Sequence, residues 1–238
     1  VLNPGISCRN SGIQAGRPLC RGRPVCYVAA MPNVTIVDGA EICAIADWLA
    51  SRLHGVGAAA SAITVPGGST PFPIIRAVID RGAVDWRRWE VWPNDDRIVP
   101  QAHEASNTGK LRALLEPAGG RIMELGEGAV PPKFALTWLG MGPDGHIASL
   151  FPNTDPKAND PLAVRRQTPD PLPAHAPFDR ITLTIPALTA TGEILFTLGG
   201  AADKVAVFEA ALAGEHDLPV ARLLRTAQAR GIPVTVFT

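Results

Sequence analysis

Asp144 and His146 stand two residues apart after a glycine-rich turn, in the stretch FALTWLGMGPDGHIASLFP (134–152). The apolar run Phe134 to Leu139 predicts a buried strand, and we expect a short helical segment to begin at the histidine. An imidazole, with an ordinary pKa of ~6.5, can take a proton from water near neutral pH, and a nearby carboxylate can orient it. The pair therefore predicts general-base chemistry at a strand end, where α/β proteins build their sites.

Other interpretations compete with catalysis at this turn. Gly140, Gly142 and Gly145 match the dinucleotide-binding pattern G-x-G-x-x-G, but no acidic residue follows at the end of a second strand to hold the ribose. Asp144 can instead serve only to cap the turn. A histidine by itself is more often structural, and we assign that role to the remaining ones, His54, His103, His175 and His216.

A second glycine turn, Pro66-Gly67-Gly68-Ser69-Thr70-Pro71, joins a predicted strand to a predicted helix. Thr70 suits a helix N-cap and Pro71 suits the first helical position. Amides at a helix N-terminus favour anions, so this turn is a candidate phosphate site, with an ordinary strand–helix turn as the alternative. The turn lacks the lysine of a P-loop, and Ser69 lacks the G-x-S-x-G surroundings of a hydrolase nucleophile.

Charged residues follow two further predicted strands. Asn94-Asp95-Asp96-Arg97 comes after one, and Gly199-Gly200-Ala201-Ala202-Asp203-Lys204 comes after the other. A lysine in the first turn of a helix opposes the helix dipole, which favours an anionic ligand near Lys204. For Asp95 and Arg97, the alternative is a solvated loop that pairs with itself.

Strands and helices alternate along the chain, which predicts an α/β fold: a doubly wound, mostly parallel sheet with helices on both faces. Because parallel strands end at one edge of a sheet, the four motifs are expected to converge. We expect helix caps at Asp38, with Glu41 three residues later, and at Ser106. Strands are expected at 33–37, 61–65, 89–92, 121–124, 134–139, 180–185, 193–198 and 233–237, helices after Asp38, Thr70, Ser106 and Gly200 and near Leu218–Leu224, and a loop over 152–179.

Composition narrows the class of protein. The 238 residues include 22 basic and 22 acidic ones, and the net charge of zero argues against a protein built to bind nucleic acid. No apolar run approaches the ~20 residues of a membrane span. The four cysteines include no C-x-x-C pair and no histidines have zinc spacing, so we expect neither a metal nor a disulfide framework, and a reducing compartment is the simpler inference.

Residues 1–30 differ from the rest, since they are rich in Arg, Gly, Pro, Ser and Cys and contain no Lys, Asp or Glu. We expect a poorly ordered or wrongly assigned upstream extension, with Met31 as the natural start and 31–238 as a single α/β domain. The basic run Arg17–Arg23 followed by the apolar run Val25–Met31 faintly resembles a signal peptide, which is the alternative.

Six motifs, in chain order, resemble the 6-phosphogluconolactonase family: PGGSTP, NDDRIVP, SNTGKLRALL, LGMGPDGHIASLFP, RITLTIPAL and GGAADK. The resemblance covers residues 33–237, and an ordered set is more specific than any single motif. The glucosamine-6-phosphate deaminases of the same superfamily share the GGSTP-like loop and the GxDGH turn but continue to Phe-Asn-Glu-Pro. This chain continues to Ala148-Ser149-Leu150-Phe151-Pro152, as the lactonases do.

The resemblance implies a Rossmann-like fold of the sugar-phosphate isomerase type and hydrolysis of 6-phosphoglucono-δ-lactone to 6-phosphogluconate in the oxidative pentose phosphate pathway. It implies a cytoplasmic enzyme for a small sugar phosphate, without metal, cofactor, nucleic acid or membrane; we expect a monomer or homodimer. His146 is then the catalytic base, helped by Asp95, Asp144 and Arg97. Substrate and phosphate are expected at Gly67, Gly68, Ser69, Thr70, Arg97, Lys204, Arg112 and Arg180, with structural ion pairs as the alternative for the last two.

Three features depart from the family pattern. Asn94-Asp95-Asp96-Arg97 stands where the family has Gly-Asp-Glu-Arg, and Ile147 stands where it has Thr. The helix that the family has between Glu124 and Phe134 is missing. Two alternatives to a lactonase remain open: a sugar-phosphate isomerase or deaminase on the same fold, and a non-catalytic sugar-phosphate sensor.

Overall fold

The computed structural model describes residues 25–28, 31–39, 41–54, 61–174 and 176–238. The eight strands of its main sheet are, in spatial order, β1 (Val25–Val28), β2 (Val34–Asp38), β11 (Val234–Phe237), β10 (Ile194–Thr197), β7 (Leu136–Leu139), β3 (Ser61–Val65), β4 (Trp89–Pro93) and β6 (Arg121–Ile122). β1 and β2 are antiparallel, and all other neighbours are parallel. A small antiparallel sheet contains β5 (Asp95–Arg97), β9 (Arg180–Leu183) and β8 (Val164–Gln167).

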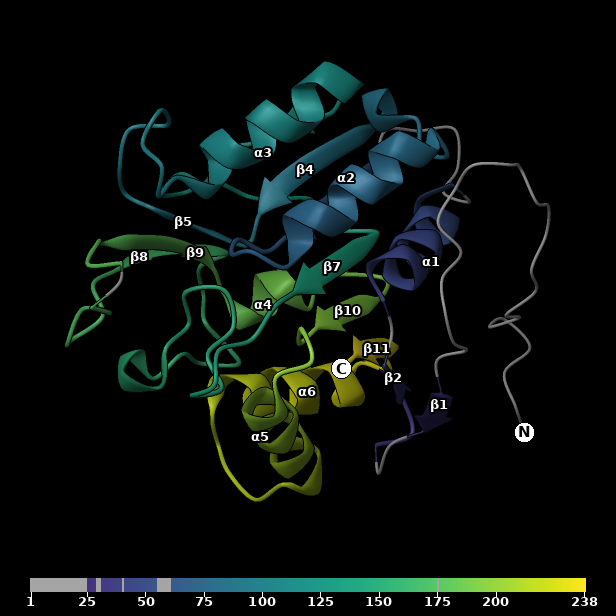
Figure 1. Ribbon diagram of the computed structural model, residues 1–238. Coiled ribbons are helices and arrows are strands. Elements are labelled where there is room, and N and C mark those ends of the chain that lie inside the picture. The colour runs from purple at the N-terminus through teal and green to yellow at the C-terminus, as the bar shows by residue number, and fades with distance from the viewer. Residues whose placement is uncertain (1–24, 29–30, 40, 55–60, 175) are drawn as a thin grey trace.

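Helices cover both faces of the main sheet (Figure 1). On one face lie α1 (Ile42–His54), α2 (Pro71–Arg81) and α3 (Asn107–Leu115), and on the other α4 (Ile185–Leu188), α5 (Ala202–Ala213) and α6 (Pro219–Ala229). Each face has its own apolar core, and β7, β10 and β11 are buried along their whole length. Strands of a parallel sheet that are covered on both faces are expected to be buried in this way. The mostly parallel sheet with helices on both faces confirms the predicted doubly wound fold.

Several predicted elements are correct, and others needed correction. The strand at 61–65 is found as predicted, and the helix after Thr70 begins at Pro71 and ends before Gly82. Asp38 does not cap α1, because it belongs to β2 and its carboxylate accepts a hydrogen bond from the Thr238 hydroxyl (2.7 Å). The region 152–179 is not all loop, since it contains β8 and a 3₁₀ turn at Pro152–Thr154.

Ser106 caps α3 as predicted: its hydroxyl accepts a hydrogen bond from the Gly109 amide (3.0 Å). We expect Ser106→Ala to lower the free energy of unfolding by about 1 kcal/mol, because the amide loses its acceptor. Urea unfolding would measure this. Ser51→Ala, which removes a hydroxyl bonded to the Trp48 carbonyl inside α1, is the control. An unchanged unfolding midpoint for the Ser106 variant would contradict the cap.

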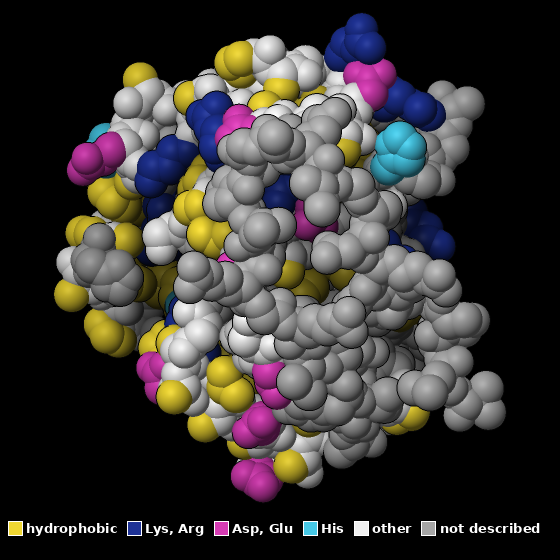
Figure 2. Space-filling model, turned by 45° about the vertical axis from the view of Figure 1, so that its right-hand side comes forward, with side chains coloured by type: hydrophobic (Ala, Val, Ile, Leu, Met, Phe, Trp, Pro, Cys, Tyr) yellow, Lys and Arg dark blue, Asp and Glu magenta, His cyan; other side chains and the backbone are white. Residues whose placement is uncertain are grey.

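The structure tests only some of the remaining predictions from the sequence. Of residues 1–30, only β1 is described, and our prediction for the remainder lies outside the described residues. Cys43 is disulfide-bonded, whereas we expected no disulfide framework from the sequence. Within the described part of the chain, no helix is long and apolar enough to cross a membrane. Where side chains are visible in Figure 2, acidic and basic groups are interspersed, in keeping with their equal numbers.

Candidate active site

Four loops meet at the carboxyl edge of the main sheet. The chain passes outward from β3 to β4 and β6, then returns to β7 and continues in the opposite direction through β10 to β11. Its order therefore reverses between β3 and β7, and open α/β sheets form their ligand crevice at such a reversal. The loops after the adjacent strands β10, β7, β3 and β4 carry the four predicted motifs, so the predicted convergence is confirmed.

His146 lies on the loop after β7, and its side chain is 30% exposed. Its Nδ1 lies 2.6 Å from Oδ1 of Asp144. The ring packs against Phe151, with ring centroids 4.7 Å apart, and also against Gly142, where a β-carbon would lie 2.2 Å from ring atoms Cε1 and Nδ1. A carboxylate, a phenyl ring and a glycine therefore hold the imidazole in one orientation.

Asp144 determines which imidazole nitrogen is basic. Its hydrogen bond with His146 lowers the pKa of Asp144, against the opposing effect of partial burial. An ionised carboxylate can only accept, so Nδ1 of the neutral ring carries the proton and Nε2 keeps its lone pair. Nε2 is thus the nitrogen that can take a proton from water.

The backbone around His146 differs from the sequence prediction. No helical segment begins there; Ile147 and Leu150 instead form an isolated bridge across a tight turn. The Gly142 amide donates to the His146 carbonyl (2.9 Å), and the Gly145 amide donates to the Gly142 carbonyl (3.0 Å). These two amides close the turn, so neither is free to bind a ligand.

Asp95 lies in β5 and is only 7% exposed. Its carboxylate accepts a hydrogen bond from the hydroxyl of Ser149, which follows the histidine on the same loop. Burial raises the pKa of Asp95, opposed by this hydrogen bond and by the charges of Arg97 and Arg180. The structure therefore places Asp144 against the imidazole and Asp95 against the segment that carries it.

Arg97 and Arg180 face each other across β5 and β9. Their guanidinium groups donate to the carbonyls of Ala105 (3.0 Å) and Ala176 (2.8 Å), respectively. Within the described part of the chain, Nε of Arg97 and both Nε and Nη1 of Arg180 have no hydrogen-bond partner. Burial first, and the Arg97 charge second, lower the pKa of Arg180. At 2% exposure Arg180 is closed to solvent, which favours its structural alternative beside Asp95, whereas Arg97 is partly exposed.

Asp96 and Asn107 belong to this neighbourhood; the sequence placed Asp96 in a predicted motif without a role and indicated no role for Asn107. The Asp96 carboxylate accepts hydrogen bonds from the amides of Asn107 (2.6 Å) and Thr108 (2.9 Å), so it caps α3 together with Ser106. The aspartate at this family glutamate position is therefore long enough to reach the helix. The sequence signals for Asn107 were its place beside the predicted cap and in the SNTGKLRALL motif, and neither indicated its contacts with residues distant in sequence.

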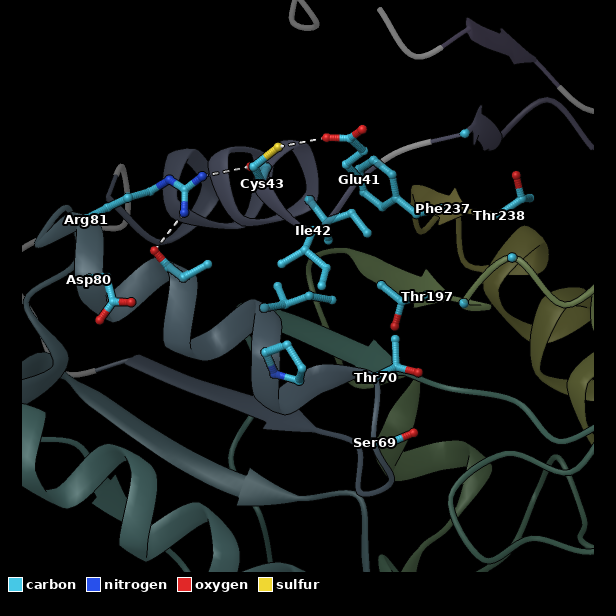
Figure 3. A pocket seen from close by; sticks show the side chains of 17 residues that line it. Glu41, Ile42, Cys43, Ser69, Thr70, Asp80, Arg81, Thr197, Phe237 and Thr238 are labelled. Carbon is cyan, nitrogen blue, oxygen red and sulfur yellow. Dashed lines mark hydrogen bonds between the residues drawn. The ribbon is translucent and has the colours of Figure 1, made fainter. Parts of the chain in front are cut away.

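The turns at Gly67–Thr70 and Gly199–Gly200 lie side by side. A β-carbon at Gly199 would be 3.4 Å from the Thr70 hydroxyl oxygen. Both turns line a cavity of about 1070 Å³ whose other walls include α1 and α2 (Figure 3). Thr70 occupies the cap position of α2, but its side chain makes no capping hydrogen bond, and the amides of a first helical turn have no partner within the helix. The hydroxyl groups and amides of this turn can therefore bind an anion.

Lys204 and Arg112 were also predicted to bind substrate. Lys204 lies in the first turn of α5, directly after the Gly199–Gly200 turn, and its amide donates to the Asp203 carboxylate (2.9 Å). Arg112 donates to Glu124 (2.6 Å) and to Gln101 (2.8 Å). Those contacts occupy the Arg112 guanidinium and favour its structural alternative.

Comparisons with known proteins show which family this chain belongs to. The family model described as glucosamine-6-phosphate isomerases/6-phosphogluconolactonase matches residues 40–126 and 115–231. A 6-phosphogluconolactonase of Pseudomonas aeruginosa is 34% identical over 186 residues, covering 68% of this chain and 77% of its own. A 6-phosphogluconolactonase of Neisseria meningitidis is 33% identical over 199 residues, which cover 73% of this chain and 82% of the relative. The crystal structure of a 6-phosphogluconolactonase from Shewanella baltica matches 85% of this chain and 96% of its own, with a TM-score of 0.68 and 26% identity.

The fold and the crevice define an α/β protein of the sugar-phosphate isomerase type. The chain belongs to the glucosamine-6-phosphate isomerase/6-phosphogluconolactonase family, and the resemblance of the six motifs is confirmed.

Proposed function

We propose that this protein hydrolyses 6-phospho-D-glucono-1,5-lactone to 6-phospho-D-gluconate with water activated by His146, as a step of the oxidative pentose phosphate pathway. The observation that carries the proposal is the 2.6 Å contact between Nδ1 of His146 and Asp144, which leaves Nε2 as a base at the switch point of the sheet. The names of the relatives in the same family support this choice of substrate.

A δ-lactone is an activated ester, so a positioned base is sufficient and no covalent nucleophile is needed. Nε2 of His146 removes a proton from water as the oxygen attacks the carbonyl carbon, and Asp144 stabilises the imidazolium that forms. The tetrahedral intermediate then collapses, the bond from the carbonyl carbon to the ring oxygen breaks, and the imidazolium returns the proton to that oxygen. The products are a carboxylic acid and an open-chain alcohol in one molecule.

We assign three parts of the site to bind the negatively charged phosphate of the substrate. The Gly67–Thr70 turn offers hydroxyls and helix N-terminal amides, Lys204 offers an ammonium group, and Arg97 offers a partly exposed guanidinium. Phosphate held away from the reacting carbon fixes the lactone relative to His146, which reduces the entropy lost on reaching the transition state.

The direct test supplies the lactone in situ from glucose 6-phosphate and a dehydrogenase, and follows acid release with and without this protein. We expect clear acceleration over spontaneous hydrolysis. Ammonia release from glucosamine 6-phosphate without lactone turnover would favour the deaminase alternative. Binding of 6-phosphogluconate without turnover would favour a sensor, and either result would overturn the proposal.

Lys204→Ala is expected to raise KM for the phosphorylated lactone about tenfold or more, since a hydrogen bond to a charged group contributes ~1.5–3 kcal/mol. Hydrolysis of unphosphorylated glucono-δ-lactone should stay unchanged. Steady-state kinetics on both substrates would measure the difference, with the exposed Lys110→Ala as the matched control. Equal losses on both lactones would contradict a phosphate-binding role for Lys204.

A further inference from the structure

Asn107 connects two parts of the site that are far apart in sequence. It is the first residue of α3 and is 1% exposed. Its side-chain amide lies against Gly67: a β-carbon there would be 2.3 Å from Nδ2, 2.4 Å from Oδ1 and 2.5 Å from Cγ. Such distances are far inside van der Waals contact, so the glycine turn approaches the amide as closely as it does only because residue 67 has no side chain.

The polar atoms of Asn107 have assigned partners. Nδ2 donates to the Asp95 carbonyl (2.9 Å) and lies 3.4 Å from the carboxylate Oδ1 of the same residue. Oδ1 accepts from Nη1 of Arg97 (3.4 Å). Exchanging the two ends of the amide would place an NH₂ group against the guanidinium and a carbonyl against a carbonyl, so these partners fix its orientation.

The backbone of Asn107 is fixed as well. Its amide donates to Asp96 (2.6 Å), and the next amide, that of Thr108, donates to the same carboxylate (2.9 Å). The side chain therefore extends from an anchored helix start, and its place does not depend on a bound substrate. The hydrogen bonds of this buried side-chain amide, and its close contact with Gly67, all involve segments of the site. Such an amide can fix the position of one segment relative to another.

We propose that Asn107 is a positioning residue, which holds the Gly67–Gly68 turn and the Arg97 guanidinium at a fixed separation so that both bind the same phosphorylated substrate. The inference rests on the proposed function and goes further, because it assigns the substrate-binding geometry to a residue that has almost no solvent exposure. Without Asn107, Arg97 loses an acceptor and the turn loses the surface that it packs on.

The first test is Asn107→Ala, with KM and kcat for the phosphorylated lactone and calorimetric binding of 6-phosphogluconate. We expect KM and the dissociation constant to rise at least tenfold, with kcat within about threefold. Ser106→Ala is the matched control, because it weakens the start of the same helix but leaves the contacts of Asn107 intact, and it should change KM less than twofold. Equal KM shifts in the two variants would show that only loosening of α3 matters and would overturn the inference.

A double-mutant cycle with Gly67→Ala tests the contact itself. Alone, Gly67→Ala should reduce kcat/KM strongly, because its methyl group overlaps the amide of Asn107. Asn107→Ala removes the three atoms nearest to the added methyl group, so the double variant should be within about threefold of Asn107→Ala alone. Additive losses would overturn the inference. If the wild-type protein does not turn over the lactone, the proposed function fails, while the binding measurements still support or refute Asn107.

Discussion

Replacing His146 with alanine is expected to lower kcat for the phosphorylated lactone by about 10²–10⁴-fold, the usual contribution of a general base. Nδ1 of the imidazole is held by Asp144, which leaves Nε2 as the nitrogen that can accept a proton. The ring is partly exposed, so its loss should not unfold the protein. Stopped assays with in situ lactone would measure kcat, and circular dichroism would check the fold.

Two further variants sharpen this test. Asp144→Asn removes the negative charge that fixes the proton on Nδ1, and it should cost less than removal of the ring itself. His54→Ala removes the last residue of α1, an exposed histidine whose Nδ1 lies 3.1 Å from the Ala83 carbonyl, and it should leave kcat unchanged. Near-normal turnover by the His146 variant, or an equal loss in the His54 variant, would rule out the assigned base.

Much of the fold was predictable because its signals are local. The central parallel strands β7, β10 and β11 are short, mostly apolar segments, and α2 is marked at both ends by Thr70-Pro71 and Gly82, whose φ of 61° suits glycine. Turn chemistry and hydrophobic periodicity depend on neighbours within a few residues, so they are visible in the chain itself. The alternation of strands and helices also predicted, without any knowledge of contacts, that the four motifs would lie at one edge of the sheet.

The small sheet was not predictable in the same way. β5 has three residues, all charged, and its strand character depends on pairing with β9, from Asp95 opposite Thr182 to Arg97 opposite Arg180. Pairing between segments more than 80 residues apart has no local signal. The sequence left open whether Asp95 or Asp144 lies beside the imidazole for the same reason, since the answer depends on where the loop after β7 lies over that sheet.

The role of the glycine turn was also only partly visible. The three glycines before His146 match a dinucleotide-binding pattern, but two of their amides make hydrogen bonds within the turn. The lack of a side chain at Gly142 matters more, because the imidazole occupies the space that a β-carbon would take. A sequence shows that a glycine is present, and only packing shows which neighbour requires it.

Gly142→Ala should therefore reduce kcat nearly as much as loss of the imidazole, by ~10²-fold or more, although it removes no functional group. The added methyl would lie 2.2 Å from Cε1 and Nδ1 of His146 and 2.7 Å from Oδ1 of Asp144, so the ring must rotate away from its carboxylate. A displacement of about 1 Å at a reacting group is enough for a loss of that size. Gly140→Ala is the matched control, since among the described residues its methyl would meet only Pro66, at an ordinary 3.9 Å, and kcat should stay within about threefold. Kinetics and thermal unfolding, measured for both variants, would separate displacement of the imidazole from a loss of stability. Equal activity of the Gly142 and Gly140 variants would mean that the position of the imidazole does not govern turnover.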